Sequence, residues 1–215
     1  MQLRTFGRTG MQLSTLGFGC GAVGGFMVRG DAADQERTVA RAIAAGVNYF
    51  DTAVQYGNGD SETNLGRVLQ RLKPAHVAVG TKVRLPPGEF GRIADTVTMS
   101  LEGSLARLGL DRVDIFHLHN PITETGGGSA LSVGQVLDDV VPAFQRLRQQ
   151  GKIRFLGMTA IGDTAALNQV IDAGVFDSAQ VVYNMLNPSA AGELPTNYPA
   201  QDYQRMFDHT KAAGV

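Results

Sequence analysis

The sequence has a single cysteine, no tryptophan and almost no excess of charge. Cys20 on its own excludes an intrachain disulfide, which is compatible with a reducing cytoplasm. The formal net charge is −1 and the isoelectric point is about 6.4, so the composition lacks the basic excess typical of proteins that bind nucleic acid or an acidic membrane. No apolar run approaches the ~20 residues of a membrane-spanning helix, and the first residues lack an apolar core of signal-peptide length. We therefore expect a cytoplasmic protein without nucleic-acid or membrane partners.

The remaining composition is that of an ordinary globular protein. The chain has 215 residues, of which 43% are hydrophobic and 18% charged. These proportions are sufficient for a sizeable buried core. We expect one domain over residues 1–215.

Segments typical of strands and helices alternate along the chain. A hairpin is predicted over residues 3–13, because a Gly-Arg-Thr-Gly turn separates two short apolar stretches. Ser61 is the predicted N-cap of the second helix. Six strand–helix pairs follow the hairpin, with strands at 13–23, 47–50, 76–82, 113–119, 153–159 and 179–183, and helices at 34–45, 61–72, 91–108, 136–150, 164–173 and 201–213. This alternation predicts parallel strands joined by helical crossovers.

Two α/β architectures have this alternation, an open doubly wound sheet and a (β/α)8 TIM barrel. The first strand-to-helix turn, GFGCGAVGG, lacks the full dinucleotide fingerprint, and no acidic residue closes a following strand at the distance that a ribose requires. We therefore predict the barrel. Six strands do not close a barrel of eight, and the final KAAGV resembles the AAGV and DAGV segments that precede earlier strands. We accordingly expect a hairpin plus six βα units, with strands seven and eight absent from this sequence.

Polar residues follow the ends of three neighbouring predicted strands, which is where barrel enzymes place their chemistry. Asp51 ends the second strand with Tyr56 five residues later, Lys82 ends the third, and His119 ends the fourth. Each alone has an ordinary explanation, as a cap, a rim aromatic, a solvated cation or a buried ring. Together on adjacent strand ends they predict one pocket. His117, within the fourth strand, is expected to be a buried core residue.

The stretch DTAVQYGNGDSETNLG, residues 51–66, resembles the Asp-Thr-Ala…Tyr-Gly…Ser-Glu…Leu-Gly signature of the aldo-keto reductase superfamily. GTK at 80–82 resembles the family's lysine strand, and VDIFHLHNP at 113–121 resembles its Val-Asp-Leu-Tyr-Leu-Ile-His-x-Pro strand. The resemblance extends from about residue 2 to residue 215. It implies a TIM-barrel oxidoreductase that uses NAD(P) and has a catalytic tetrad of Asp51, Tyr56, Lys82 and His119.

The chemistry of such an enzyme explains these residue types. Reduction of a carbonyl by a nicotinamide requires a hydride on carbon and a proton on the developing alkoxide. A phenol transfers that proton more readily when a neighbouring cation stabilises the phenolate. Tyr56 is thus expected to be the acid and base, Lys82 the cation, and Asp51 the group that keeps Lys82 charged and oriented. His119 is expected to hydrogen-bond the substrate oxygen.

The resemblance also implies contacts to the cofactor, which we expect to be NADPH, with NADH as the alternative. The family's Ser-Asn pair after the fifth strand is Thr159-Ala160 here, which keeps a hydroxyl and loses an amide. The glycine turn near residue 20 matches a loop beside the cofactor, although a plain tight turn explains it equally well. The implied cofactor contacts are Gly19, Cys20, Gly21, Asp51, Thr159 and Gln180.

The expected substrate is a small carbonyl compound or sugar, reduced as an aldehyde or ketone or oxidised as a hemiacetal or alcohol. Asn120 takes a position where many relatives carry a large aromatic residue, and we expect it to contact the substrate. With no tryptophan in the chain, a polar pocket for small oxygenated or sugar-like aldehydes is favoured. No metal site is expected.

Two alternatives remain open. The first is a regulatory subunit that senses NADP and turns over slowly or not at all, which the intact tetrad disfavours and Ala160 favours. The second is an aldolase that forms a Schiff base on Lys82, which leaves Tyr56 and Asp51 without matching roles.

Overall fold

The computed structural model of the protein describes residues 1–21 and 23–215. The chain begins with an antiparallel hairpin of β1 (Leu3–Phe6) and β2 (Met11–Ser14), joined by the 3-10 turn η1 (Gly7–Thr9). Gly10 closes the turn at a φ of 70°, a conformation that favours glycine. The hairpin expected over residues 3–13 is confirmed.

Six parallel strands form one sheet in the order in which they occur along the chain. They are β3 (Phe18–Gly19), β4 (Tyr49–Asp51), β5 (Ala78–Val83), β6 (Val113–Leu118), β9 (Ile153–Thr159) and β10 (Ser178–Gln180). A doubly wound sheet reverses its strand order at a switch point, whereas a barrel wall is wound in sequence. The sheet is therefore the wall of a partial (β/α) barrel. The first strand, expected over 13–23, is much shorter, and the part of that prediction at Ala22 lies outside the described residues.

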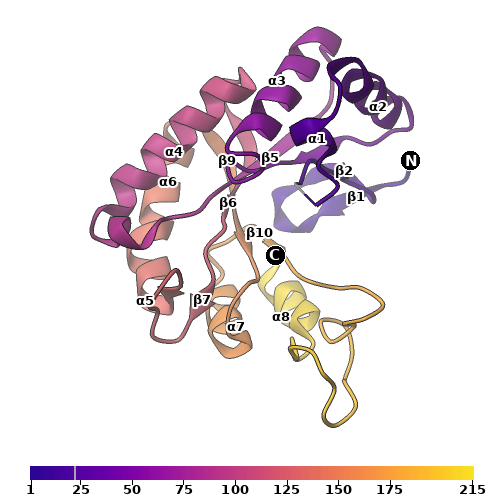
Figure 1. The fold of residues 1–215 in the computed structure, drawn as a ribbon. Coiled ribbons are helices and arrows are strands. Elements are labelled where there is room, and N and C mark those ends of the chain that lie inside the picture. Colours follow the sequence, from indigo (N-terminus) through magenta and orange to yellow (C-terminus); the bar gives the residue numbers. More distant parts are fainter. Residues whose placement is uncertain (22) are drawn as a thin grey trace.

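The crossover helices form an arc on the outer side of the sheet (Figure 1). They are α2 (Ala32–Ala44), α3 (Asp60–Leu72), α4 (Ile93–Leu108), α6 (Val141–Gln149), α7 (Thr164–Asp172) and α8 (Met206–Ala213). The last helix starts five residues later than expected because Gln204 and Arg205 have positive φ angles. Ser61 is not an N-cap, since α3 begins at Asp60 after Gly59, and the Ser61 hydroxyl bonds elsewhere.

Short elements that the sequence did not predict connect these units. They are α1 (Phe26–Arg29), η2 (Pro87–Arg92), β7 (Ile122–Thr123), β8 (Leu131–Ser132) and α5 (Val133–Gln135). The helix expected over 136–150 consists of the π-turn η3 (Val136–Val140) followed by α6, and α5 lies directly before it. Ser132 caps α5 in a reciprocal arrangement with Gln135. Pro142, at the start of α6, has no N–H to continue an α-helical ladder, which accounts for the break before it.

Strand alternation separates two apolar layers. Residues on the outer face of the sheet, such as Phe116 and Leu156, pack against the helices in the main core. A smaller cluster of Met11, Leu13, Ala78 and Ile115 lies inside the curve of the sheet, where the hairpin closes its lower end. Inward positions near the opposite end carry polar side chains, and that end is the one with the carboxyl termini of the strands.

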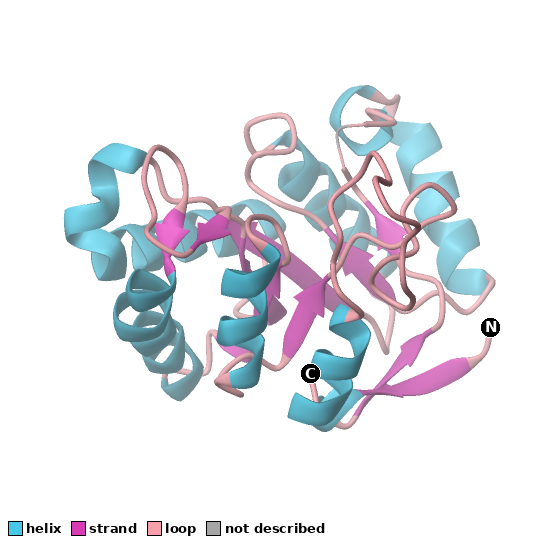
Figure 2. Ribbon diagram, turned by 90° about the horizontal axis from the view of Figure 1, so that it is seen from below, coloured by secondary structure: helices cyan, strands magenta, loops and turns pink. Residues whose placement is uncertain are grey.

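The C-terminal helix returns to the N-terminal hairpin, and the two lie side by side in Figure 2. The Arg8 backbone N–H donates to Gly214 O at 3.0 Å. Its guanidinium bonds the Asp177 carboxylate at 3.0 Å, just before β10. Segments far apart in the sequence are therefore tied together at the lower end of the sheet. Within the described residues, no helix is both long and apolar enough to cross a membrane.

Candidate active site

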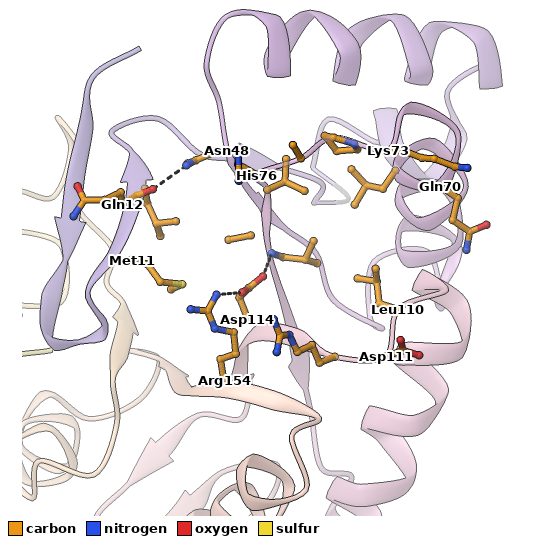
Figure 3. A pocket seen from close by; sticks show the side chains of 18 of the residues that line it. Met11, Gln12, Asn48, Gln70, Lys73, His76, Leu110, Asp111, Asp114 and Arg154 are labelled. Atoms are coloured by element: carbon orange, nitrogen blue, oxygen red, sulfur yellow. Dashed lines mark hydrogen bonds and ion pairs between the residues drawn. The ribbon is translucent and has the colours of Figure 1, made fainter.

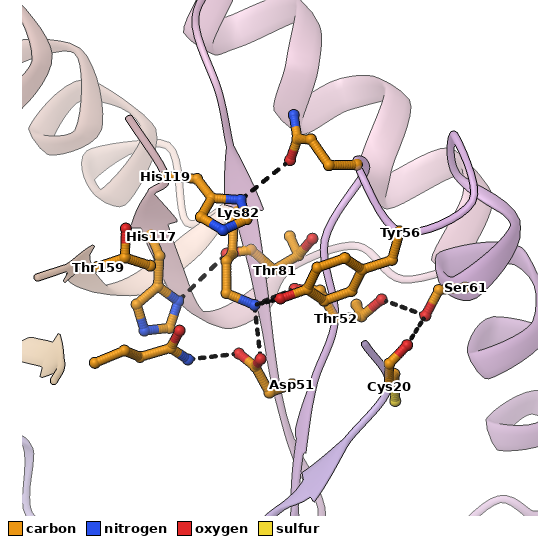
Figure 4. A network of polar contacts seen from close by, with 12 residues as sticks. Cys20, Asp51, Thr52, Tyr56, Ser61, Thr81, Lys82, His117, His119 and Thr159 are labelled. Carbon is orange, nitrogen blue, oxygen red and sulfur yellow. Dashed lines mark hydrogen bonds and ion pairs between the residues drawn. The ribbon is translucent and has the colours of Figure 1, made fainter. Parts of the chain in front are cut away.

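Three of the four predicted tetrad residues meet at one cation (Figure 4). Lys82 Nζ donates to Asp51 Oδ2 at 2.6 Å, to Thr52 O at 2.9 Å and to Tyr56 OH at 3.0 Å. Asp51 ends β4, Lys82 lies near the end of β5, and Tyr56 lies in the turn before α3. Asp51 and Tyr56, which the sequence grouped with Lys82 near the carboxyl ends of the strands, therefore both contact Lys82 directly.

The Lys82 ammonium is enclosed by these contacts. Its side chain is only 1% exposed, and burial of a charge is costly unless it is paired. A lysine ammonium has three N–H donors, and the three contacts use all of them. The nitrogen also lies 4.7 Å from the centroid of the Tyr56 ring. This geometry favours a fixed positive charge next to the phenolic oxygen.

His119 completes the group from the residue after β6. Its ring meets the Tyr56 ring edge to face, with centroids 6.2 Å apart, and Nδ1 lies 3.3 Å from Gln55 Oε1. Partial burial, followed by the positive charges of Lys82 and Arg84, lowers the pKa of His119 to about 4. The imidazole is therefore neutral near pH 7. A neutral ring can donate one hydrogen bond toward a substrate oxygen.

Two further residues contact Oδ1 of Asp51, the carboxylate oxygen that does not bind Lys82. Gln180 Nε2 donates to Asp51 Oδ1 at 2.7 Å, and Tyr49 OH lies 3.5 Å from the same oxygen. Burial, then the Asp51 charge, raises the pKa of Tyr49 well above its usual value, so this phenol stays neutral. A Cβ at Gly80 would lie 2.3 Å from the Tyr49 hydroxyl, so only glycine leaves room for it. Sequence reasoning missed Tyr49, although its place two residues before Asp51 put both side chains on one face.

The glycine turn beside the tetrad leaves open space. No heavy atom lies within 4 Å of a Cβ placed at Gly19, and one placed at Gly21 would lie 3.9 Å from the Tyr56 ring. The Cys20 side chain is buried, and burial raises the pKa of its thiol to about 12. Its carbonyl accepts from Ser61 Oγ at 2.9 Å. Thr159 Oγ1 donates to Leu118 O at 3.1 Å.

The structure places Asn120 differently from the expected substrate contact. Asn120 alternates with His119 and so faces the helix layer, where it is fully buried. Its Oδ1 accepts from Leu85 N at 2.8 Å, and its Nδ2 donates to Leu85 O at 2.8 Å and Ser129 O at 3.0 Å. All of these partners are backbone atoms, so Asn120 fixes the loop after β5 and does not face the pocket.

His117 is the buried core residue that its strand position predicted. Nε2 lies 3.2 Å from Ser178 Oγ and Nδ1 lies 3.4 Å from Thr81 O. Burial lowers its pKa to about 4. A Cβ at Gly157 would lie 2.3 Å from the ring, so the neighbouring strand makes room for it with glycine.

A cleft of about 970 Å³ lies at the opposite end of the sheet (Figure 3). It is bounded by the hairpin and by loops that precede the strands. Its central carboxylate, Asp114, is already bonded by Val79 N at 2.9 Å and Arg154 Nη1 at 2.7 Å. Catalysis in barrels occurs at the other face, so the group of polar residues around Lys82 is the better candidate.

Comparison with known proteins identifies the family. The profile of the Aldo/keto reductase family matches residues 15–204, and the chain belongs to this family.

The curated relatives include a dehydrogenase and a reductase. The chain is 37% identical to L-galactose dehydrogenase of Arabidopsis thaliana over 75% of the chain and 49% of that protein. It is 27% identical to the NADH-specific methylglyoxal reductase of Escherichia coli over 87% of the chain and 60% of that protein. The chain therefore spans about half to three-fifths of the length of these relatives.

The same fold occurs in a solved aldo/keto reductase from Klebsiella pneumoniae in complex with NADP and acetate. The TM-score is 0.69 at 23% identity, and the match covers 97% of this chain and 65% of the other. Solved members of the family that resemble this chain thus include an NADP complex.

Proposed function

We propose that the protein is an NADPH-dependent carbonyl reductase in which Tyr56 donates the proton. The observation that carries this proposal is the set of three contacts that Lys82 makes with Asp51, Thr52 and Tyr56. An enclosed ammonium beside a phenol stabilises the phenolate left after proton donation. The proposed substrate is a small aldehyde, ketone or sugar hemiacetal.

The proposed steps assign a separate task to each residue. Tyr56 gives its proton to the carbonyl oxygen, while Lys82 stabilises the remaining negative charge. Asp51 holds Lys82, and Gln180 and Tyr49 hold Asp51 from its other oxygen. His119 donates from Nε2 to the same substrate oxygen once the Gln55 amide, whose Oε1 lies 3.3 Å from Nδ1, turns so that its NH2 group donates to that nitrogen. The reverse reaction, oxidation of an alcohol, uses the same groups.

The residues present fit a nicotinamide cofactor, which supplies the hydride when bound. A carboxylate only accepts hydrogen bonds, so the Gln180 NH2 group must face Asp51, and its carbonyl oxygen remains to accept from a carboxamide. The open space beside Gly19, close to the half-buried Tyr56 ring, leaves room for a flat ring. We propose Gly19, Gly21, Thr159 and Gln180 as cofactor contacts, with NADPH preferred and NADH as the alternative. The buried Cys20 contributes through its backbone.

We also propose that the whole chain forms one domain and that the protein is cytoplasmic. One apolar cluster runs between the sheet and the helices from Cys20 to Met206, which supports a single domain over residues 1–215. A single buried thiol suits a cytoplasmic location.

The geometry bears on both alternatives. A Schiff-base lysine needs a free lone pair, whereas the three contacts of Lys82 occupy all of its ammonium donors. A slow NADP-sensing subunit would keep the cofactor contacts without needing Tyr56, so the effect of Tyr56 on turnover separates it from an enzyme.

The test is oxidation of NADPH with a panel of small aldehydes by the wild-type protein and by Tyr56→Phe. Loss of general acid catalysis is expected to lower kcat by about 10²- to 10⁴-fold. Tyr203→Phe is the matched control, because it removes a phenolic hydroxyl on a core-packed ring outside the site. NADPH affinity, measured by fluorescence, is expected to change little in either variant. Equal turnover by Tyr56→Phe and wild type would refute the proposed role of the tyrosine.

A further inference from the structure

Arg84 lies beside the catalytic histidine at the mouth of the site. Strands β5 and β6 pair in parallel with Lys82 opposite His117 and Val83 opposite Leu118. The His119 N–H donates to Val83 O at 2.8 Å, which continues this register beyond the strand ends. One further step along the register puts Arg84 opposite His119. Arg84 also follows Lys82 by two residues, so both side chains belong to the inner face of the sheet.

The backbone on both sides of Arg84 is fixed. Val83 is fully buried and Leu85 is 1% exposed, so both neighbours are anchored in the helix-facing core. The Asn120 side chain holds Leu85 by both its N–H and its carbonyl, each at 2.8 Å. Arg84 itself is exposed. Because both of its neighbours are anchored, its Cα position and the direction in which its side chain leaves the backbone are defined. This clamp gives Asn120 a positioning role in place of the direct substrate contact expected from the sequence.

The charge of Arg84 is free for a ligand. Among the described residues, no hydrogen bond or ion pair to the Arg84 guanidinium occurs, although many other arginines pair with carboxylates. The positive charges of Lys82 and then Arg84 add to burial in lowering the pKa of His119, so both act at the place where substrate would bind. Asp51 opposes them but is already bonded to Lys82 and Gln180.

We propose that Arg84 binds a carboxylate or phosphate group carried by the carbonyl substrate, so that the preferred substrates are anionic aldehydes or ketones. This inference rests on the proposed reductase function. A guanidinium offers a planar fork of donors that matches the two oxygens of such a group and has no acceptor for a hydroxyl proton. Tyr56 and His119 take the carbonyl oxygen, and Arg84 takes the anionic end a short chain away.

The kinetic test uses two aldehydes of nearly the same shape, 4-oxobutanoate and its uncharged counterpart 4-methylpentanal. We expect the wild-type protein to favour 4-oxobutanoate in kcat/KM by about 10- to 100-fold, the range for one charge-assisted hydrogen-bonded pair. Arg84→Gln should bring the ratio close to one, and Arg84→Lys should restore part of it. Arg92→Gln is the matched control, because Arg92 is an exposed arginine paired with Glu89.

A second test needs neither cofactor nor turnover. The His119 imidazole is titrated by NMR with methanesulfonate, which stays anionic at pH 4, and with sodium chloride at equal ionic strength. Methanesulfonate should raise the pKa of His119 in the wild type and in Arg92→Gln, because it neutralises Arg84. Arg84→Gln should start from a higher pKa and show no such response.

The two tests fail in distinguishable ways. A wild-type protein that reduces both aldehydes with the same kcat/KM, or an Arg84→Gln variant that keeps the wild-type ratio, overturns the inference and leaves the reductase function intact. If neither aldehyde is reduced, the proposed function fails, and the titration still decides on Arg84. An equal response of His119 in wild type and Arg84→Gln overturns anion binding at Arg84.

Discussion

At the scale of single residues, the centre of the site is a chain of contacts among Tyr56, Lys82, Asp51 and Gln180. Lys82 contacts Tyr56, Asp51 contacts Lys82, and Gln180 contacts Asp51. The low dielectric of a buried position makes such contacts stronger and makes an unpartnered member costly. Removal of one member is therefore expected to affect the others.

His117 gives a prediction for pH. Its folded-state pKa of about 4 lies below the unfolded value near 6.5, so between these values the unfolded chain binds one more proton. The contribution of His117 to the free energy of unfolding is fully present above pH 6.5, falls as the pH is lowered and levels off below about pH 4. Protonation of His117 accounts for on the order of 3 kcal/mol of that loss.

Urea unfolding between pH 7 and pH 4 measures this effect. His117→Asn should flatten the curve by about one proton, whereas His76→Asn, at an exposed position, should not. His119 contributes in the same direction and remains in both variants. An unchanged pH dependence in His117→Asn would show that this ring does not titrate as its burial implies.

The sequence could predict which polar residues the structure brings together around Lys82, but not the direction in which every candidate side chain points. Asp51, Tyr56 and Lys82 were found because they follow strand ends and match a family motif. The substrate contact expected of Asn120 came from the large aromatic residue that many relatives carry at this position, whereas strand alternation turns Asn120 away from His119 and buries it in the helix layer. The contact between Gln180 and Asp51 joins residues 129 positions apart, and the sequence contains no local signal for it.

At the scale of elements, the strands and helices followed from apolar periodicity, whereas their ends did not. Strand β3 has only two paired residues, because the glycine-rich stretch around it supplies few side chains to pack. The π-turn before α6 depends on Pro142, and the late start of α8 depends on two positive φ angles. Such ends are set by single backbone conformations and not by a repeating pattern.

Asn120→Ala tests the link between the ends of β5 and β6. It leaves the buried Leu85 N–H without its acceptor and removes two further hydrogen bonds. We expect a loss of about 2–3 kcal/mol in unfolding free energy. Hydrogen exchange of the Leu85 amide should accelerate, while that of Val79, in the middle of the sheet, should follow global stability only. Unchanged protection at Leu85 would contradict the proposed clamp.

At the scale of the whole molecule, the hairpin connects the start of the chain to its last helix. The Arg8 backbone N–H joins them by donating to Gly214 O, and the Arg8 guanidinium also holds Asp177 just before β10. Arg8→Ala should destabilise the protein by about 1–2 kcal/mol, because Asp177 is largely buried and loses a charged partner. Arg4→Ala, at an exposed position in β1, should have little effect.

Hydrogen exchange locates the change caused by Arg8→Ala. The amides of β1, β2 and β10 should lose protection together, because the variant removes the side-chain contact to Asp177 and keeps the backbone contact to Gly214, and those of β5 and β6 should not. Loss of protection confined to the hairpin would contradict a structural connection between the hairpin and the segment before β10.

The most direct test of the central claim, that the protein reduces carbonyls by hydride transfer, is isotope transfer from NADPH deuterated at both C4 positions. Mass spectrometry and NMR of the alcohol product are expected to show one deuterium on the former carbonyl carbon. In Tyr56→Phe the same product should form far more slowly with the deuterium at the same position. A folded protein that binds NADPH but forms no deuterated alcohol from any aldehyde or ketone in the panel would contradict the account.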